Sequence, residues 1–305
     1  MQVGVVKAAD DADLARLRVM CTRHDDWRQV YRSNVMTVYE KSDHHGKIVK
    51  VTATMNETAA NVYDVWNDDI YAAEWKSCIC QWHSVFRVSS NSDIGCRVVK
   101  MPKFMANREF VTQREWRDFD SEMMTFCHSV DHVAVLPKRN CIRAVCYLDC
   151  FHVMVTANSK YEAGCVLMSI TQYDLQGIMP SWLSTMLTRK SSVKVIKKLV
   201  KACLKYRSWK QEHFPLFKPW IHGEQIALPQ LSATDIREWE LTALQDRTSE
   251  VVEEVAVVVE REEVEFVVES DDDVAPNGQQ SVWGYVTNLV SRLWSEGTNN
   301  TFLTG

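Results

Sequence analysis

The sequence predicts an α+β fold in which an antiparallel sheet is followed by one long C-terminal helix. Between residues 79 and 174, segments rich in Val, Phe, Tyr, Thr and Cys follow one another with only turn signals between them. Successive strands without intervening helices favour antiparallel pairing. Residues 179–210 then have the spacing of a long amphipathic helix. The 305-residue chain has 46% hydrophobic and 25% charged residues, which excludes collagen-like, fully disordered and multi-pass membrane classes.

The elements before residue 79 are a helix, two strands and a second helix. Apolar residues at helical spacing predict a helix over Asp11–Gln29, with aspartates at its start, where a helix N-terminus favours acids. Alternating apolar residues predict strands over Val35–Glu40 and Lys47–Met55, joined by a turn at Asp43–Gly46. Residues 56–58 provide capping side chains for a helix that runs to Asp68.

The central part of the chain is predicted to form six strands. Turn signals such as those at residues 91–93, 118–121 and 158–159 separate them. A long helix follows, beginning at Met179 and Pro180 because proline is tolerated in a first helical turn, and the α+β domain ends near Trp220. The six predicted strands are Cys80–Val88, Cys96–Met101, Arg108–Arg117, Met123–Val130, Ile142–Val155 and Cys165–Tyr173.

The net charge of −5 hides an uneven distribution along the chain. Residues 222–305 hold 17 acidic and 4 basic side chains, whereas residues 1–221 hold 23 acidic and 31 basic ones. We therefore divide the chain into a basic body, residues 1–221, and an acidic, largely flexible tail, residues 222–305. Within the tail, Leu231–Asp246 and Ser281–Ser295 have helical spacing. The second segment is amphipathic and is predicted to act either as a membrane anchor or as a docking helix for a partner protein.

Ser270 is a predicted regulatory site in the acidic tail. It lies between Glu269 and three consecutive aspartates, which is the context of an acceptor for an acidophilic kinase. Phosphorylation would add about −1.5 to −2 charge. We expect the tail to compete with anionic membranes for the basic helix, more strongly when Ser270 is phosphorylated. The alternative is a tail that only keeps the protein solvated.

Several classes of site have no support in the sequence. Nucleotide-binding glycine motifs, a nucleophile elbow and the HExxH zinc motif are all missing, so no catalytic residue, cofactor or metal ligand is predicted. The pairs His128/His132 and Cys78/Cys80 are interpreted as structural. The N-terminus has no secretory signal, and no apolar run reaches about 20 residues. We therefore expect a cytoplasmic protein whose ten cysteines are reduced.

The predicted long helix carries a basic face. Eight basic and no acidic residues lie between Arg189 and Arg207. A solvated outer face would explain them, and so would attraction to anionic lipid headgroups, which contributes about 1 kcal/mol per basic residue. Nucleic acid is disfavoured because no aromatic and basic sheet motif for base stacking is present. The residues predicted to contact anionic membranes transiently are Lys190, Lys194, Lys197, Lys198 and Lys201.

Several separate segments resemble the signature motifs of START domains, the lipid-transfer modules related to the steroidogenic acute regulatory protein. In chain order they are Asn107–Val111, Ile142–Ala144, Asp174–Leu183 and Ala202–Tyr206. Residues 209–222 are similar to the phosphatidylcholine-transfer-protein-like branch. The resemblance covers roughly residues 13–220. It implies a helix-grip fold, in which a curved antiparallel sheet wraps the long C-terminal helix around a lipid-sized tunnel.

The resemblance also implies a function without chemistry. The protein is expected to be a monomer that binds one phospholipid of the phosphatidylcholine or phosphatidylethanolamine class and shuttles it between membranes. A lipid sensor or scaffold that regulates a partner is an alternative, and so is a carrier of another lipid, such as a sterol or fatty acid.

The resemblance also indicates which residues contact the lipid. Members of this family that bind phosphatidylcholine carry an Arg and an Asp where this chain has Ala72 and Lys76. One such member has Trp where this chain has Arg97. Lys76 or Arg97 is therefore a candidate for holding a phosphate. For the aromatic residues among the predicted lipid-binding residues, packing in the core is the alternative role. The predicted lipid-binding residues are Trp75, Lys76, Arg97, Phe110, Tyr147, Trp182 and Met186.

Residues 131–140 match the position of the family's omega-loop lid. An apolar loop tip suits contact with a membrane better than contact with water. The predicted lid residues are Val133, Val135 and Leu136.

Overall fold

The computed structural model describes residues 1–77, 79–103, 105–131, 135, 137–177 and 181–231. Ten strands form one sheet in the order β1-β2-β3-β10-β9-β7-β6-β5-β4, with β8 pairing in parallel with β6. All other neighbouring strands are antiparallel, as predicted. The strands are β1 (Arg28–Arg32), β2 (Met36–Asp43), β3 (Gly46–Thr58), β4 (Ile79–Ser89), β5 (Ser92–Val99), β6 (Asn107–Asp118), β7 (Glu122–Ser129), β8 (Cys141–Arg143), β9 (Val145–Val155) and β10 (Ala163–Asp174).

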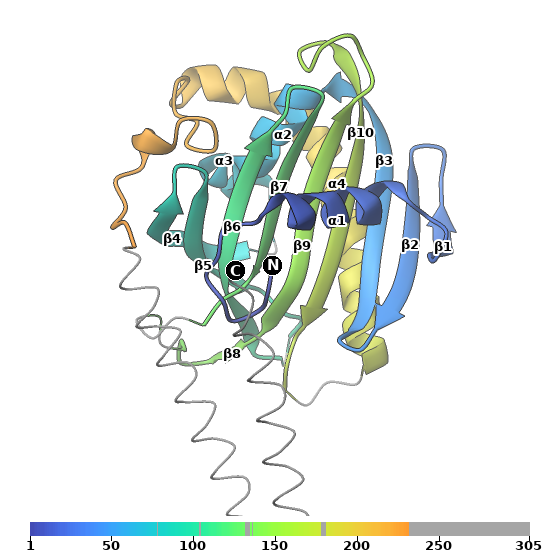
Figure 1. Ribbon diagram of the computed structural model, residues 1–305, viewed down its shortest axis with the longest axis vertical. Coiled ribbons are helices and arrows are strands. Elements are labelled where there is room, and N and C mark those ends of the chain that lie inside the picture. The colour runs from blue at the N-terminus through green and yellow to red at the C-terminus, as the bar shows by residue number, and fades with distance from the viewer. Residues whose placement is uncertain (78, 104, 132–134, 136, 178–180, 232–305) are drawn as a thin grey trace, which may run out of the picture. The chain divides into compact units, whose positions relative to one another are not determined.

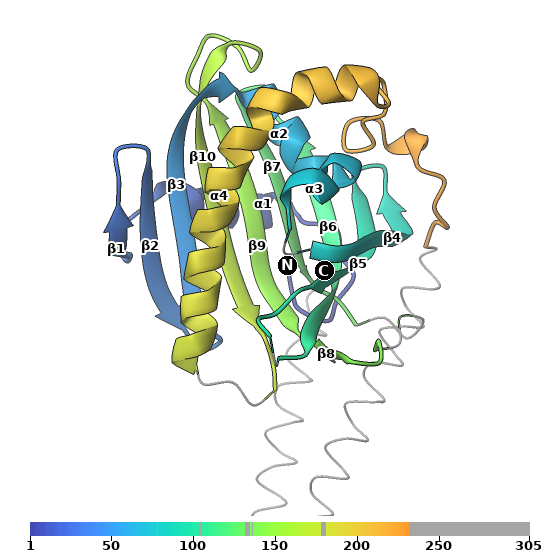
Figure 2. The same ribbon diagram turned by 180° about the vertical axis from the view of Figure 1, so that it is seen from behind.

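Four α-helices cover the two faces of this sheet. Helix α1 (Asp11–Thr22) crosses one face, and α2 (Ala59–Asn67), α3 (Asp69–Trp75) and α4 (Ser181–Glu212) lie on the other, where the sheet curves around α4 (Figures 1 and 2). The α+β architecture and the long C-terminal helix are therefore confirmed. Among the described helices, none is long and apolar enough to cross a membrane.

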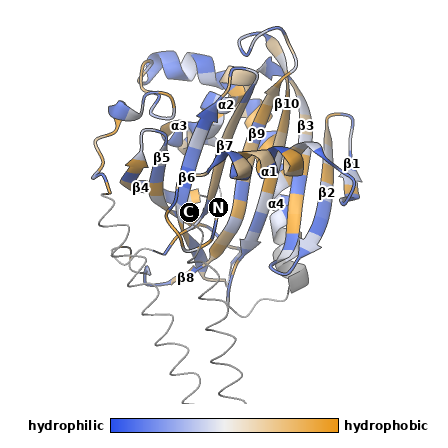
Figure 3. Ribbon diagram, in the orientation of Figure 1, coloured by the Kyte–Doolittle hydropathy of each residue, from blue (hydrophilic) through white to orange (hydrophobic). Residues whose placement is uncertain are grey.

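Side chains that alternate along the strands pack into separate apolar clusters on the two faces of the sheet. In β9, Cys150 packs with the α1 core, whereas Phe151 and Val153 pack with the core beneath α2 and α4. This period of two is the reason that the strands could be read from their apolar pattern. Figure 3 shows hydrophobic and hydrophilic residues interleaved along the sheet.

Several elements differ from the predicted ones, and the following differences are the largest. Helix α1 ends at Thr22 rather than Gln29, because the Lys50 ammonium donates to the carbonyls of Met20 and Arg23 and so satisfies the last turn. The following residues form the edge strand β1, which was not predicted. The predicted strand over Ile142–Val155 is split into β8 and β9, and the helix that runs to Asp68 is followed directly by α3.

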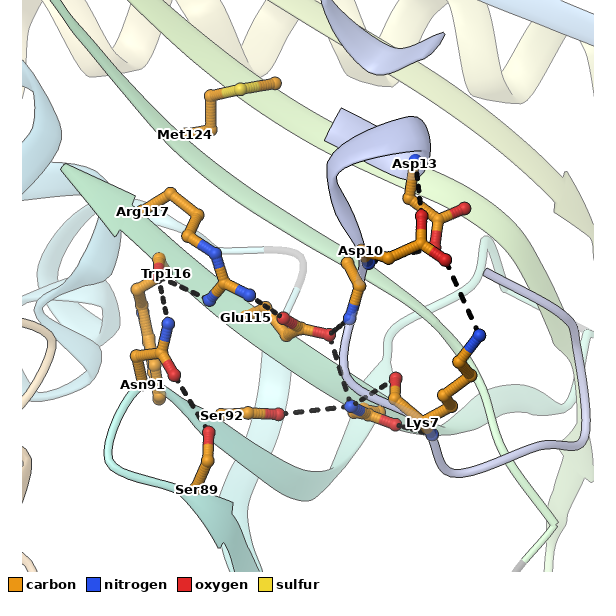
Figure 4. Close-up of polar contacts among 12 residues, drawn as sticks. Lys7, Asp10, Asp13, Ser89, Asn91, Ser92, Glu115, Trp116, Arg117 and Met124 are labelled. Carbon is orange, nitrogen blue, oxygen red and sulfur yellow. Dashed lines mark hydrogen bonds and ion pairs between the residues drawn. The ribbon is translucent and has the colours of Figure 1, made fainter. Parts of the chain in front are cut away.

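The N-terminal segment is attached to the outer face of the sheet by buried polar side chains of β6. Gln113 accepts a hydrogen bond from the Lys7 amide (3.0 Å) and donates one to the Lys7 carbonyl (3.0 Å), and Glu115 accepts one from the Ala9 amide (2.8 Å) (Figure 4). Burial raises the pKa of Glu115. Asp10 then caps α1 by accepting from the Asp13 amide (2.9 Å). These contacts fix where α1 begins.

The carboxyl end of α4 is anchored to the junction of α2 and α3 by buried charges. Lys210 lies 2.6 Å from Asp68 Oδ2, and the Tyr206 hydroxyl donates to the same oxygen at 2.9 Å. Asp68 also accepts hydrogen bonds from the amides of Ile70 and Tyr71, so it caps α3. This one carboxylate therefore joins α3 to α4.

A second aspartate of the same junction anchors the chain after α4. Asp64 accepts from Trp220 Nε1 at 2.8 Å and from Lys218 Nζ at 2.6 Å. Beyond the predicted boundary at residue 221, Gln230 forms a bridge with Arg87 of β4, and Leu231 is buried. The predicted helices at 231–246 and 281–295 lie outside the described residues, apart from Leu231.

Replacing Asp68 with alanine should destabilise the domain strongly. The change leaves the buried Lys210 ammonium without its carboxylate and removes the cap of α3, which together cost about 3–5 kcal/mol. Asp120→Asn is the control, because Asp120 is 94% exposed in its ion pair with Lys160, and should change stability by less than about 0.5 kcal/mol. Urea unfolding followed by circular dichroism measures both variants. An Asp68→Ala variant as stable as Asp120→Asn would contradict this role.

Candidate functional site

A cavity of about 680 Å³ lies between the amino-terminal half of α4 and the sheet. We call it the large chamber. Its floor comes from β5, β6, β9 and β10, and one wall comes from α4, through Ser192, Val195 and their neighbours. The volume is in the range of about 300–1,000 Å³ that is usual for small-molecule sites. Its described aromatic and aliphatic lining residues are Trp66, Trp75, Ile79, Val99, Met101, Met105, Phe110, Tyr173, Leu175 and Val195.

A smaller cavity of about 220 Å³ adjoins it beneath α3, and we call it the small chamber. Polar residues of β4, β6 and β7 line much of it, among them Gln81, Thr112 and Thr125. The residues that line both chambers mark where they adjoin, and these are Trp66, Lys76, Ile79, Arg97 and Asp149.

Arg97 holds a polar cluster at this junction. Its guanidinium lies 3.1 Å from Asp149 and donates to the Tyr173 hydroxyl at 3.2 Å, and Tyr173 donates in turn to Asp149. Burial raises the pKa of Tyr173 well above its ordinary value, so the phenol is neutral. The Arg97 Nε atom has no partner among the described groups. The cluster therefore keeps one buried donor free.

Lys76 is the second cation at the junction. It donates to the Trp66 carbonyl at 2.9 Å, and its ammonium lies over the rings of Trp66 and Trp75, 4.2 and 5.0 Å from their centroids. Burial lowers the pKa of Lys76 to about 8. At neutral pH the ammonium is mostly protonated, without a carboxylate within ion-pair distance among the described residues.

Two other buried polar atoms of the chambers lack partners within the described part of the chain. They are Trp75 Nε1 in the large chamber and the Thr112 hydroxyl in the small chamber. Buried donors in native proteins are nearly always satisfied, by protein, water or a ligand. The chambers are therefore equipped to receive a molecule with an apolar part and a hydrogen-bonding part.

The structure brings together four of the seven predicted lipid-binding residues. Trp75, Lys76, Arg97 and Phe110 line the chambers, and Ala72 lines the small chamber. Met186 of α4 is half-buried but is not among the described lining residues, and the side chain of Trp182 lies outside the described part of the chain.

Tyr147 does not line either chamber as the structure describes them. The pairing of β9 with β10 shifts by one residue between Cys146 and Leu148, and such a bulge re-aims a side chain. The Tyr147 ring stacks on His45 at the β2–β3 turn, with centroids 4.0 Å apart. Tyr147 is therefore not placed among the described lining residues, and its contact with a lipid stays a prediction.

Described residues of loop 100–106 line the large chamber, whereas the described residues of the predicted lid at 131–140 are not among its lining residues. Lys100, Met101, Pro102, Lys103 and Met105 line the chamber. In the predicted lid, Val135 is half-buried against an apolar cluster on β5 and β6. Val133 and Leu136 lie outside the described residues. The apolar residues of 100–106 are the sequence signal that could have found this loop.

The motif residues Arg108, Glu109 and Arg143 stabilise the fold rather than line the chambers. Arg108 donates to the carbonyls of Leu175 and Gln176, just before α4. Glu109 is buried and accepts from Arg143 at 3.1 Å and from the Lys138 amide at 3.1 Å. Burial opposes ionisation of Glu109, but these donors lower its pKa below the ordinary value. Three of the four signature segments therefore meet at one end of the sheet.

Four of the five predicted membrane-contacting lysines are exposed, and one of these four, Lys194, also borders the large chamber. Lys190, Lys197 and Lys201 are exposed on the outer face of α4. Lys194 and Lys198 line the large chamber, and Lys198 donates to the Ser77 hydroxyl at 2.6 Å. Ser270 lies outside the described residues, so its regulatory role stays a prediction.

The chain is similar to proteins of known family over most of its length. A family model of the START domain matches residues 7–209. START domain-containing protein 10 from human is 29% identical over 262 residues, which cover 85% of this chain and 87% of that protein, and the mouse protein of the same name gives the same figures.

Solved structures agree with this similarity. The crystal structure of human STARD10 matches with a TM-score of 0.71 at 29% identity, covering 76% of this chain and 94% of the other. Human StAR-related lipid transfer protein 5 matches in fold, with a TM-score of 0.59 at 13% identity over 65% of this chain and 95% of the other. With this family match, and with its curved sheet closed by α4 over a cavity, the chain belongs to the START domain family.

Proposed function

We propose that the protein is a non-enzymatic lipid-transfer protein that binds one phospholipid in the two chambers and carries it between membranes. The observation that carries this proposal is the large chamber, an apolar cavity of about 680 Å³ that adjoins a polar chamber with unpartnered donors. Burying acyl chains contributes about 0.8 kcal/mol per CH₂ group, so such a cavity favours a lipid over a small polar metabolite. The phosphatidylcholine or phosphatidylethanolamine class, which the family resemblance implies, is the starting expectation for its headgroup.

The chemistry of the lining supports transfer without catalysis. The described residues of the two chambers include no histidine, and their carboxylates, Asp69 and Asp149, are paired with Arg114 and Arg97. A general base must be free to take a proton, and a carboxylate held by a guanidinium is poorly suited to that role. The similarity to START domain-containing protein 10 also supports a binding function.

The outer face of α4 supports a reversible encounter with an anionic membrane. Lys190, Lys197 and Lys201 are exposed there, and so are the apolar side chains Val200 and Leu204, which are 43% and 77% exposed. Basic residues attract anionic headgroups, and apolar residues among them favour contact with the interface. This face is next to the chamber wall formed by Lys194 and Lys198, so docking and lipid exchange would occur on the same helix.

Filling the large chamber should abolish transfer without unfolding the protein. Ser192 lines the chamber, and a tryptophan in its place occupies space that acyl chains need. We expect Ser192→Trp to lower the transfer of fluorescent phospholipid between vesicles by at least about tenfold. Ser208→Trp is the control, because Ser208 is exposed on the same helix. Equal transfer by both variants would contradict the proposed cavity. Lipid binding by the wild type without any transfer would favour the lipid-sensor alternative.

Removing the exposed lysines should weaken membrane binding in a salt-dependent manner. The variant Lys190→Gln/Lys197→Gln/Lys201→Gln should bind anionic vesicles on the order of 100-fold more weakly at low salt, at about 1 kcal/mol per residue. Co-sedimentation with vesicles at rising salt measures the loss. A control that changes Arg23, Arg32 and Lys47 to Gln removes the same charge from exposed positions outside α4. If both variants lose binding equally, net charge rather than this face of α4 is responsible.

A further inference from the structure

The charges that face the two chambers are unbalanced. Seven cationic side chains line them, whereas Asp69 and Asp149 are the only carboxylates among the described lining residues, and both are already paired with arginines. The excess comes from five lysines. None of these lysines has a carboxylate within ion-pair distance in the described part of the chain. They are Lys76, Lys100, Lys103, Lys194 and Lys198. Lys76 and Lys198 are half-buried, whereas Lys100, Lys103 and Lys194 are exposed at the edge of the large chamber. A site with this balance attracts anions and repels cations.

The aromatic faces of the chambers are already occupied by cations of the protein itself. The Lys76 ammonium lies over Trp66 and Trp75, and the Arg97 guanidinium lies 5.0 Å from the Phe110 centroid and 5.5 Å from that of Tyr173. A quaternary ammonium is recognised by free aromatic faces within about 6 Å. A choline group at these rings would lie beside a buried like charge.

The remaining ring contacts do not supply such a site. Arg114 lies over Trp82 in the small chamber, with its Cζ atom 4.4 Å from the ring centroid. Phe126 lines the small chamber without a described cation over it, but one ring does not make a cage. A choline headgroup therefore has no unoccupied cage among the described residues.

The free hydrogen-bonding groups at the junction are donors. Lys76 donates one of its three N–H bonds to the Trp66 carbonyl. Arg97 Nε at the junction and Trp75 Nε1 in the adjoining large chamber are buried and lack partners among the described groups. Such donors suit a group that is rich in acceptor oxygens and negatively charged, as phosphate is.

We propose that the chambers select a phospholipid with a net negative headgroup, held by its phosphate between Lys76 and Arg97, and that they exclude phosphatidylcholine. The acyl chains occupy the large chamber, and the polar substituent on the phosphate points into the small chamber. This rests on the proposed lipid-transfer function and changes the headgroup class that the family resemblance implies.

The test compares trace amounts of labelled phosphatidylglycerol and phosphatidylcholine with the same acyl chains. Both tracers are placed in donor vesicles of one bulk composition, so that the surface charge and the docking of α4 are equal. We expect wild-type protein to transfer the phosphatidylglycerol at least about tenfold faster. Equal transfer, or faster transfer of phosphatidylcholine, would overturn the proposal and leave the transfer function intact. If neither tracer is bound or moved, the transfer function itself fails.

A variant of Lys76 tests whether the preference for phosphatidylglycerol arises at the junction of the two chambers. Lys76→Met keeps a long side chain but removes the charge, and should reduce phosphatidylglycerol transfer about tenfold while phosphatidylcholine transfer changes little. Lys47→Met is the control, because Lys47 is exposed on the β2–β3 hairpin. A variant that keeps the wild-type preference would show that Lys76 does not hold the phosphate.

Competition with oleate distinguishes a phosphate ligand from a carboxylate ligand. Displacement of phosphatidylglycerol by equimolar oleate would assign the site to a carboxylate and contradict a phosphate site.

The pH dependence of the wild type gives a readout that does not require a variant. Because the pKa of Lys76 is about 8 in the ligand-free protein, the ammonium loses its proton as the pH rises from 7 to 9. Phosphatidylglycerol, a phosphodiester, keeps its charge in this range. Binding should therefore weaken as pH rises and take up a proton above about pH 8. A flat profile for the wild type would contradict the role of Lys76. The other charged groups around Lys76 are Asp69 on α3, Arg97 on β5, Arg114 on β6, Asp149 on β9 and Lys194 and Lys198 on α4.

Discussion

The pair formed by Lys210 and Asp68 determines how α4 can lie on the sheet. Asp68 belongs to the junction of α2 and α3, caps α3, and accepts hydrogen bonds from both Lys210 and Tyr206. A buried pair of this kind has little net effect on stability in itself but is costly to break, so it specifies one position for the carboxyl end of the helix. Ile196, Leu199 and Cys203 are buried along this half of α4. The other half borders the large chamber. The cavity exists because one helix, fixed at its far end, covers a curved sheet that it does not fill.

The basic residues of the body, residues 1–221, occupy two kinds of position in the fold. Part of the basic excess is exposed on α4, at Lys190, Lys197 and Lys201, where it faces solvent. Another part lines the chambers, at the half-buried Lys76 and Lys198 and at the exposed Lys194. Burying Lys76 costs hydration, which is the reason that its pKa falls to about 8. Below pH 8 this penalty on folding is fully present, and between pH 8 and the ordinary lysine value it is relieved. A bound anion would offset the same penalty at neutral pH.

Much of the fold was accessible from the sequence, because strand alternation and helix caps are local signals. The turn at Gly46, the Thr58 cap and the long helix all follow from such signals. The end of α1 was not accessible, because Lys50, which satisfies its last carbonyls, comes from β3. The signature segments could be recognised as motifs, but the contacts of Arg108 with the chain before α4 and of Glu109 with Arg143 depend on distant segments meeting.

The site was only partly accessible for the same reason. Trp75, Lys76, Arg97 and Phe110, four of the predicted lipid-binding residues, line the chambers. Tyr147 does not, because a bulge between β9 and β10 changes its direction, and alternation alone cannot locate a bulge. The stacking of Lys76 on Trp66, and of Arg97 on the rings of β6 and β10, could not be predicted from the sequence, because each contact joins different elements of the fold.

The central claim is that the space beneath α4 holds one lipid molecule. Native mass spectrometry of the intact protein after exposure to a natural lipid extract tests it most directly, because the released ligand is identified without being assumed. The account predicts one phospholipid per chain, with a net negative headgroup. A chain that remains free of lipid, or that releases only phosphatidylcholine, would contradict it.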